Sequence, residues 1–121
     1  MEISVGTDLE EVARVARWLF EGKGLDRLFT DSELAYAKSK GAGEAQTLTG
    51  LYCAREAFCK AVGEGVGLLM RREMEIVHEP GGRPSLRLWG ETAKRFSSYS
   101  FSVSISHSKD YATATVIAWR P

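Results

Sequence analysis

The spacing of apolar residues divides the chain into extended and helical segments. Apolar side chains alternate with small or polar ones over residues 3–7, which predicts a short N-terminal strand. Over residues 12–20 they recur at steps of three and four, the pattern of an amphipathic helix. Gly22 and Gly24 are expected to end that helix.

Two further helices are predicted in the first half. Thr30-Asp31-Ser32-Glu33 has the pattern of a capping box, so a helix is expected from there to about Lys40. After a glycine break at residues 41–43, a long helix is predicted over residues 44–62. The side chains expected to face inward from it are Leu48, Leu51, Tyr52, Phe58 and Val62.

The second half has the alternation of strands. The segments predicted there are strands at 73–77, 86–88, 101–105 and 111–119, with a short helix at 91–96. The turn residues Pro80 to Pro84 join the first two strands into a hairpin. Helices in one half and antiparallel strands in the other indicate an α+β fold, taken as one domain over residues 1–121.

Composition narrows the class of protein. Basic and acidic residues number 16 each, which argues against a protein that binds nucleic acid. No apolar run is long enough to span a membrane. Cys53 and Cys59 fall on different faces of the predicted long helix, so we expect buried, reduced thiols in a cytoplasmic protein.

Several polar residues fit both a structural and a chemical role. Asp8 follows the first strand, where it would either cap the next helix or bind a metal ion. Glu56 and Lys60 have the spacing of a surface ion pair, or of a Mg²⁺-binding carboxylate beside a phosphate-binding ammonium. Gly63 and Gly65 either end the long helix or offer amides to a phosphate.

Two segments nearer the C-terminus also fit either a structural or a ligand-binding role. His107 continues the alternation of residues 101–105, so it is expected at the edge of the core. There it would bond either the backbone of a turn or a phosphate. Arg83 lies in a predicted turn, where a solvated tip is the simplest interpretation.

The order of these blocks along the whole chain resembles the holo-acyl carrier protein synthases, the small 4'-phosphopantetheinyl transferases. The matching blocks are Gly6 to Leu9 with Arg14, Arg27 to Leu34, Ala54 to Ala61, Gly81 to Pro84, and Val103 to Ser108 followed by Tyr111-Ala112. The resemblance implies the small phosphopantetheinyl transferase fold, an antiparallel sheet packed with a long central helix and shorter helices. It also implies a homotrimer with sites between neighbouring subunits.

The implied reaction transfers 4'-phosphopantetheine from the co-substrate coenzyme A to a serine of an apo acyl carrier protein. Adenosine 3',5'-bisphosphate leaves, and the pathway is fatty-acid or polyketide biosynthesis. By resemblance, Asp8 and Glu56 hold Mg²⁺, although Mn²⁺ suits the same ligands, and Lys60 lies at the pyrophosphate. A metal-bound water, Glu56 and His107 are, in that order, candidates for the base that takes the serine proton.

Other residues match positions that contact the substrates in the resembled family. Arg14 matches a basic residue of the helix that docks the carrier, and Arg55 stands where a lysine is usual. The residues expected to bind coenzyme A are Arg55, Lys60, Gly63, Gly65, Gly82, Arg83, Pro84, Ser106 and His107. By resemblance, the last five of these hold its nucleotide end.

One position departs from the resembled pattern. Many members have Gly-Arg-Phe where this chain has Gly50-Leu51-Tyr52, so an arginine near a coenzyme A phosphate is replaced by Leu51. The missing charge-assisted contact is worth about 1–3 kcal/mol unless another arginine compensates. An alternative hypothesis is therefore a catalytically weak carrier-binding or trimerisation module, and a third is a Mg²⁺-dependent phosphohydrolase.

Overall fold

The computed structural model describes residues 1–22, 24–69 and 71–121. Its main sheet is antiparallel, in the order β1 (Glu2–Glu11), β5 (Tyr111–Arg120) and β4 (Ser100–His107). β2 (Met74–His78) and β3 (Pro84–Leu88) form a second, two-stranded sheet, and β3 contacts β4. The strands form two sheets, and the predicted hairpin is confirmed.

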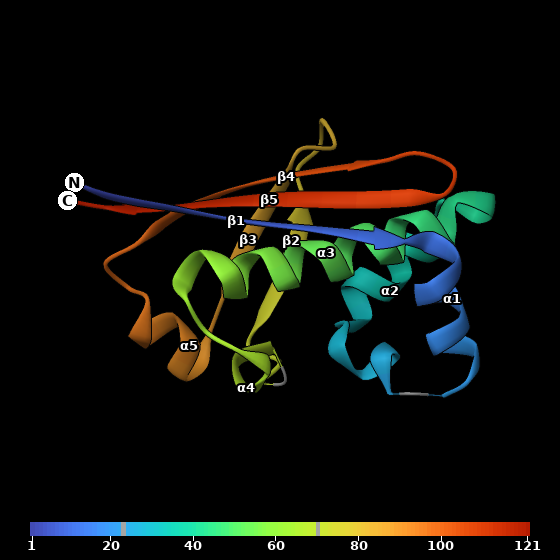
Figure 1. Ribbon diagram of the computed structural model, residues 1–121, viewed down its shortest axis with the longest axis horizontal. Helices are drawn as coiled ribbons and strands as arrows, with labels where there is room; N and C mark the ends of the chain where they lie inside the picture. The colour runs from blue at the N-terminus through green and yellow to red at the C-terminus, as the bar shows by residue number, and fades with distance from the viewer. Residues whose placement is uncertain (23, 70) are drawn as a thin grey trace.

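The long helix α3 (Glu44–Val62) has the predicted bounds and runs along the main sheet (Figure 1). The even-numbered side chains of β1 face it, because Ser4 Oγ donates to the Ala61 carbonyl at 2.6 Å. A Cβ on Gly6 would overlap the Ala57 carbonyl oxygen, so glycine allows β1 and α3 to approach closely. The same alternation directs Asp8 toward α3.

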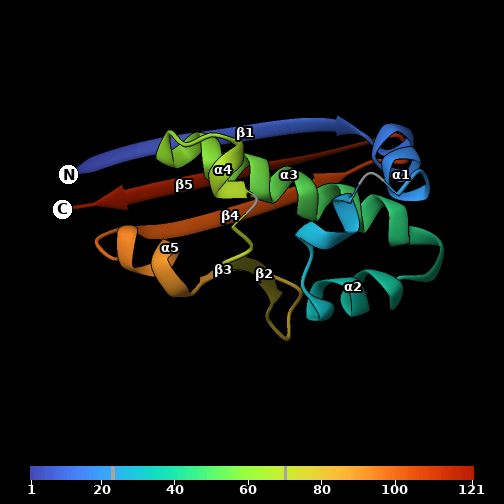
Figure 2. The same ribbon diagram turned by 90° about the horizontal axis from the view of Figure 1, so that it is seen from below.

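The shorter helices lie at the two ends of α3. α1 (Val12–Phe20) and α2 (Asp31–Lys38) lie at one end, whereas α4 (Val66–Leu69) and α5 (Gly90–Arg95) lie toward the other (Figure 2). The predicted capping box of α2 is confirmed, with both side chain–amide bonds present. Two 3₁₀ turns, Leu25–Leu28 and Gly41–Gly43, were not predicted. None of the described helices is long and apolar enough to cross a bilayer.

β1 extends further than residues 3–7. It continues to Glu11 because β5 pairs with it along its whole length, down to Glu11 opposite Tyr111. Asp8 therefore lies inside the strand opposite Ala114, and Glu11 occupies the N-cap of α1. The interpretation of Asp8 as a helix cap is wrong, and its carboxylate is available for another role.

The face of the main sheet turned away from α3 carries exposed apolar side chains. Ile3, Val5 and Leu9 of β1 are each more than 60% exposed, and Tyr111 and Ile117 of β5 are also exposed. An exposed apolar patch of this kind commonly marks an interaction surface.

Candidate functional site

Asp8 and Lys60 meet where β1 lies against α3. The Lys60 ammonium donates to Asp8 Oδ1 at 3.3 Å and to the Thr7 carbonyl at 2.9 Å. Among the described residues Lys60 thus forms its ion pair with Asp8, and the alternative of a surface pair with Glu56 is not formed. The second oxygen, Asp8 Oδ2, is buried with no hydrogen-bond partner among the described residues. A buried carboxylate oxygen without a donor is a suitable ligand for a hard cation.

Glu56 lies one helical turn before Lys60 on α3, in the neighbourhood of the Asp8 carboxylate. Its Oε1 accepts a hydrogen bond from the Tyr52 hydroxyl at 3.0 Å. Glu10, two residues beyond Asp8 on the same face of β1, adds a third acidic charge close to Asp8 and Glu56 but pairs with Arg14 at 3.8 Å. Burial, followed by the charges of Asp8 and Glu56, raises the pKa of Glu10, and Arg14 opposes this shift. Glu10 was missed from the sequence, although its spacing from Asp8 on a strand would have indicated it.

The donor set determines which cation would fit. The described part of the chain contains no group of three or more His, Cys, Asp or Glu arranged to hold a metal ion. Asp8 and Glu56 therefore offer two carboxylates. Mg²⁺ is commonly bound by one or two carboxylates, with substrate phosphates and water as its other ligands. The residues thus fit Mg²⁺ shared with a phosphorylated ligand and do not fit a closed zinc site.

The two cysteines next to this group are free and buried, as predicted. Cys53 Sγ donates to the Ala112 carbonyl at 3.4 Å. Burial, and then the charge of Asp8, raises the pKa of Cys53 to about 12. Burial, and then Glu56, raises the pKa of Cys59 to about 11. Protonated, inaccessible thiols are poor nucleophiles, so neither cysteine is suited to covalent catalysis.

A separate pocket of about 390 Å³ gathers much of the predicted nucleotide site. Gly82, Pro84 and His107 line it together, and Leu51 of α3 forms part of its wall. His107 shares this pocket with Ile105, which agrees with the predicted alternation, although its own side chain is exposed.

The remaining predicted nucleotide residues lie around this pocket. Ser106 lies in a neighbouring hollow of about 240 Å³, which it lines with His107 and Leu9. Arg83 is exposed in the hairpin turn. Three of the five predicted nucleotide residues therefore come together directly, and the other two flank them.

Positive charge reaches the pocket from a residue that the sequence did not suggest. Lys40 lines it, and its ammonium lies 4.8 Å from the centre of the Tyr36 ring. Tyr36 also stacks on His78, with 3.7 Å between ring centres and 8° between planes. Burial, and then the charge of Lys40, lowers the pKa of His78, which favours its neutral form. Lys40 rather than His78 therefore supplies the positive charge of this pocket.

The two groups of residues project from different sides of α3. Leu51 and Glu56 are five residues apart, which turns the helix by about 140°. One chain therefore presents a carboxylate–lysine group and a nucleotide-sized pocket that do not face each other.

The glycines after α3 end the helix. Gly63 has φ 74°, and Glu64 donates to the Cys59 carbonyl at 2.9 Å, which is the pattern of a Schellman cap. Helix termination explains Gly63 fully. Gly65 is exposed in the loop that follows.

Arg55 does not reach a ligand surface. Only 1% of the residue is exposed, and both guanidinium branches donate to Glu33, with a further bond to the Met74 carbonyl at 3.2 Å. The expectation that Arg55 contacts coenzyme A does not fit this position, because its donors are occupied inside the core. We therefore leave it out of the candidate site.

Arg14 lies on the exposed side of α1, as its predicted docking role requires. Its guanidinium lies over the ring of Trp18, 4.5 Å from the centre, and 3.8 Å from Glu10 Oε2. The side chain is 55% exposed, so an acidic partner can reach it.

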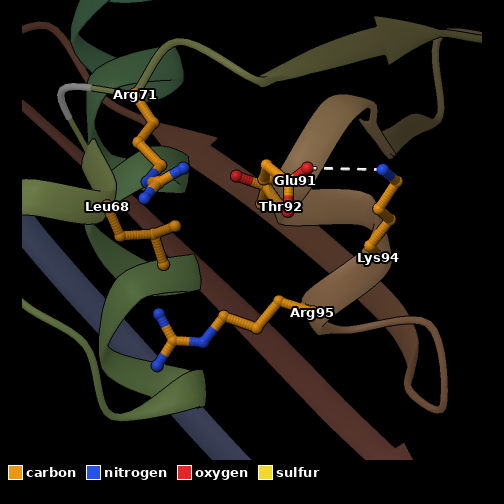
Figure 3. Close-up of a pocket in the computed structure, with 6 residues that line it drawn as sticks. All are labelled: Leu68, Arg71, Glu91, Thr92, Lys94 and Arg95. Carbon is orange, nitrogen blue, oxygen red and sulfur yellow. Dashed lines mark hydrogen bonds and ion pairs between the residues drawn. The ribbon is translucent and has the colours of Figure 1, made fainter.

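A further pocket of about 410 Å³ lies between α4 and α5 (Figure 3). Its basic side chains are already paired, Lys94 with Glu91 at 3.3 Å and Arg71 with Glu73 at 3.7 Å. Arg95 pairs with Glu64. This balance of charge gives the pocket little attraction for an anion, and it contains none of the predicted site residues.

Comparison with known proteins gives consistent matches over the whole chain. The family model described as the 4'-phosphopantetheinyl transferase superfamily matches residues 4–116. The holo-[acyl-carrier-protein] synthase of Treponema denticola is 36% identical over 120 residues, covering 97% of this chain and 98% of the relative. That of Syntrophotalea carbinolica is 38% identical over 119 residues, covering 93% and 92%.

Solved structures match the fold equally well. The ACPS–CoA complex of Chronobacterium ammoniagenes superposes with a TM-score of 0.89 at 27% identity, covering 100% of this chain and 99% of that one. The holo-(acyl-carrier-protein) synthase of Bacillus anthracis in complex with CoA (3',5'-ADP) gives 0.80 at 30% identity, covering 98% and 96%.

Proposed function

Because the chain belongs to the 4'-phosphopantetheinyl transferase superfamily, we propose that it transfers 4'-phosphopantetheine from coenzyme A to a serine of an apo acyl carrier protein. Adenosine 3',5'-bisphosphate is the second product. The observation that carries this proposal is the unpartnered, buried Asp8 Oδ2 next to Lys60. A protein that only bound a carrier would not require a buried carboxylate oxygen without a hydrogen-bond donor.

Phosphoryl transfer depends on neutralising charge and on alignment more than on covalent help. Asp8 and Glu56 would hold Mg²⁺, which when bound neutralises charge on the pyrophosphate. Lys60 Nζ is fixed by Asp8 and Thr7, and its side chain is 54% exposed, so the ammonium also faces an incoming pyrophosphate. The raised pKa values of both thiols leave direct attack by the carrier serine as the simplest route.

The pocket lined by Gly82, Pro84 and His107 suits the nucleotide end of coenzyme A. Gly82 has φ 89° and open space where a Cβ would lie, which leaves room for a ligand beside the turn. Lys40 supplies the positive charge that Leu51 lacks, which favours an active enzyme over the catalytically weak module.

Two features of the single chain support the proposed homotrimer with its sites between subunits. The carboxylate–lysine group and the nucleotide pocket project from different sides of α3, so a neighbouring copy is needed to bring the two together. The apolar outer face of β1 and β5 offers a surface for that contact. Arg14 on α1 would dock the carrier protein, in the cytoplasm, for fatty-acid or polyketide biosynthesis.

The release of adenosine 3',5'-bisphosphate from coenzyme A tests this function. The transferase should release it only when Mg²⁺ and an apo carrier protein are both present. Release without a carrier would indicate the phosphohydrolase, and no release with any fatty-acid or polyketide carrier would favour the binding module. Glu56→Gln should abolish release while the oligomer stays intact by gel filtration.

A further inference from the structure

Tyr52 makes a contact with the site that no part of the proposed reaction has used. It lies one turn before Glu56 on α3, and its hydroxyl donates to Glu56 Oε1 at 3.0 Å. Many members of the resembled family have phenylalanine at this position, which lacks the hydroxyl. A phenol at hydrogen-bond distance restricts the rotation of the carboxylate it bonds.

The ring of Tyr52 is itself held in place. Trp18 of α1 packs edge-on against it, with ring centres 6.1 Å apart and planes at 77°. Arg14, also on α1, lies over the Trp18 ring at 4.5 Å. The contact with α1 therefore restrains the Tyr52 ring, and a restrained ring gives the hydroxyl a defined direction.

We infer that Tyr52 is a positioning residue that orients the Glu56 carboxylate for a divalent cation. One carboxylate oxygen, Oε1, accepts the phenolic hydrogen bond, which restricts the rotation of the group and leaves Oε2 to bind the cation. This inference rests on the proposed function, because it assigns Glu56 to the cation. Partners of this kind typically change metal affinity or activity by about 10–100-fold.

Tyr52→Phe is a suitable test because it removes the hydroxyl and keeps the ring against Trp18. Mn²⁺ serves as the probe, and the free ion is measured by electron paramagnetic resonance in the absence of coenzyme A. The dissociation constant for Mn²⁺ should rise by about 10–100-fold. In the transfer assay, kcat of the variant should fall at low Mg²⁺ and return toward the wild-type value when Mg²⁺ is raised.

Tyr99→Phe is the matched control. Tyr99 packs against Phe96 and Phe101, away from Glu56, and the variant should keep wild-type Mn²⁺ affinity. Circular dichroism melts confirm that both variants fold, and Trp18→Phe provides a second variant that loosens the ring without touching the hydroxyl. It should also weaken Mn²⁺ binding.

Two results would overturn the inference. One is a Tyr52→Phe variant with wild-type Mn²⁺ affinity, and the other is a loss of kcat that added Mg²⁺ does not restore. In both cases the wild-type protein would still transfer phosphopantetheine, so the proposed function would stand. A wild-type protein that neither binds Mn²⁺ nor transfers would instead refute both.

Discussion

The buried ion pair of Arg55 and Glu33 links α3 to α2, and its removal should destabilise the fold without affecting the substrates. Arg55 Nη1 donates to Glu33 Oε2 at 2.7 Å, and Nη2 donates to Glu33 Oε1. Glu33 also accepts the Ile76 amide at 2.9 Å and the Thr30 amide at 2.9 Å. The carboxylate thus joins the start of α2, the middle of α3 and strand β2.

Arg55→Met would leave the Glu33 charge buried and uncompensated. Breaking a buried pair in this way costs about 3–5 kcal/mol of the free energy of unfolding. At about 4 °C per kcal/mol for a chain of this size, the melting temperature should fall by about 12–20 °C. The two backbone amides remain, so Glu33 keeps part of its hydrogen bonding and the lower end of this range is expected.

Urea unfolding followed by circular dichroism measures the loss, at one fixed protein concentration because assembly would shift the midpoint. Lys94→Met is the matched control, since Lys94 pairs with Glu91 at 3.3 Å and both side chains are exposed, 78% and 69%. Its cost should stay below about 1 kcal/mol. At a temperature where Arg55→Met is folded, its KM for coenzyme A should equal that of the wild type.

A different outcome would refute this reasoning. If Arg55→Met lost less than about 1 kcal/mol and raised the KM for coenzyme A by about tenfold, the guanidinium would belong to the ligand site, as the family resemblance first suggested. The structure predicts the opposite pattern.

Three other predictions concern the pocket, the thiols and the pH dependence of stability. Lys40→Ala should reduce the preference for coenzyme A over dephospho-coenzyme A by about tenfold, consistent with the loss of one charged hydrogen bond. Titration calorimetry measures both affinities, with Lys38→Ala as the control, and an unchanged preference would show that Lys40 does not bind the phosphate that dephospho-coenzyme A lacks. Iodoacetamide at pH 8 should leave Cys53 and Cys59 unmodified in the native protein and modify both in urea, because burial raises their pKa values to about 12 and about 11; rapid native labelling would contradict this. The pKa of His78 is lowered from 6.5 by burial and Lys40, so the unfolded chain binds the proton more tightly and stability should fall as pH drops below about 6.5. His78→Phe should flatten that dependence in urea titrations, and an unchanged slope would exclude His78 as its source.

The sequence predicted best those elements that local signals define. α3 was predicted with its exact bounds because glycines flank a continuous helical spacing, and the capping box of Thr30 and Glu33 is likewise local. The length of β1 was not predictable in this way. Leu9 is the one apolar residue among residues 8–11, too little to define a strand there, and the segment is extended because β5 pairs with it.

The candidate site could be predicted only in part for the same reason. Asp8 and Lys60 touch across 52 positions of sequence, and Glu56 and Lys60 alone indicated only a helical ion pair. Lys40 was missed because only the hairpin turn and β4, brought beside the end of α2, make it part of a pocket. Arg55 was placed at the ligand by family resemblance, whereas its burial depends on Glu33, 22 residues earlier.

Intact-mass spectrometry of an apo acyl carrier protein tests the central proposal most directly. The carrier is incubated with coenzyme A, Mg²⁺ and the wild-type protein, with Glu56→Gln as the parallel sample. The account predicts that one phosphopantetheine is added to a serine by the wild type and none by the variant. A carrier that gains no mass, for every fatty-acid and polyketide carrier tried, would contradict the transferase, and equal gain with Glu56→Gln would contradict the role of its carboxylate.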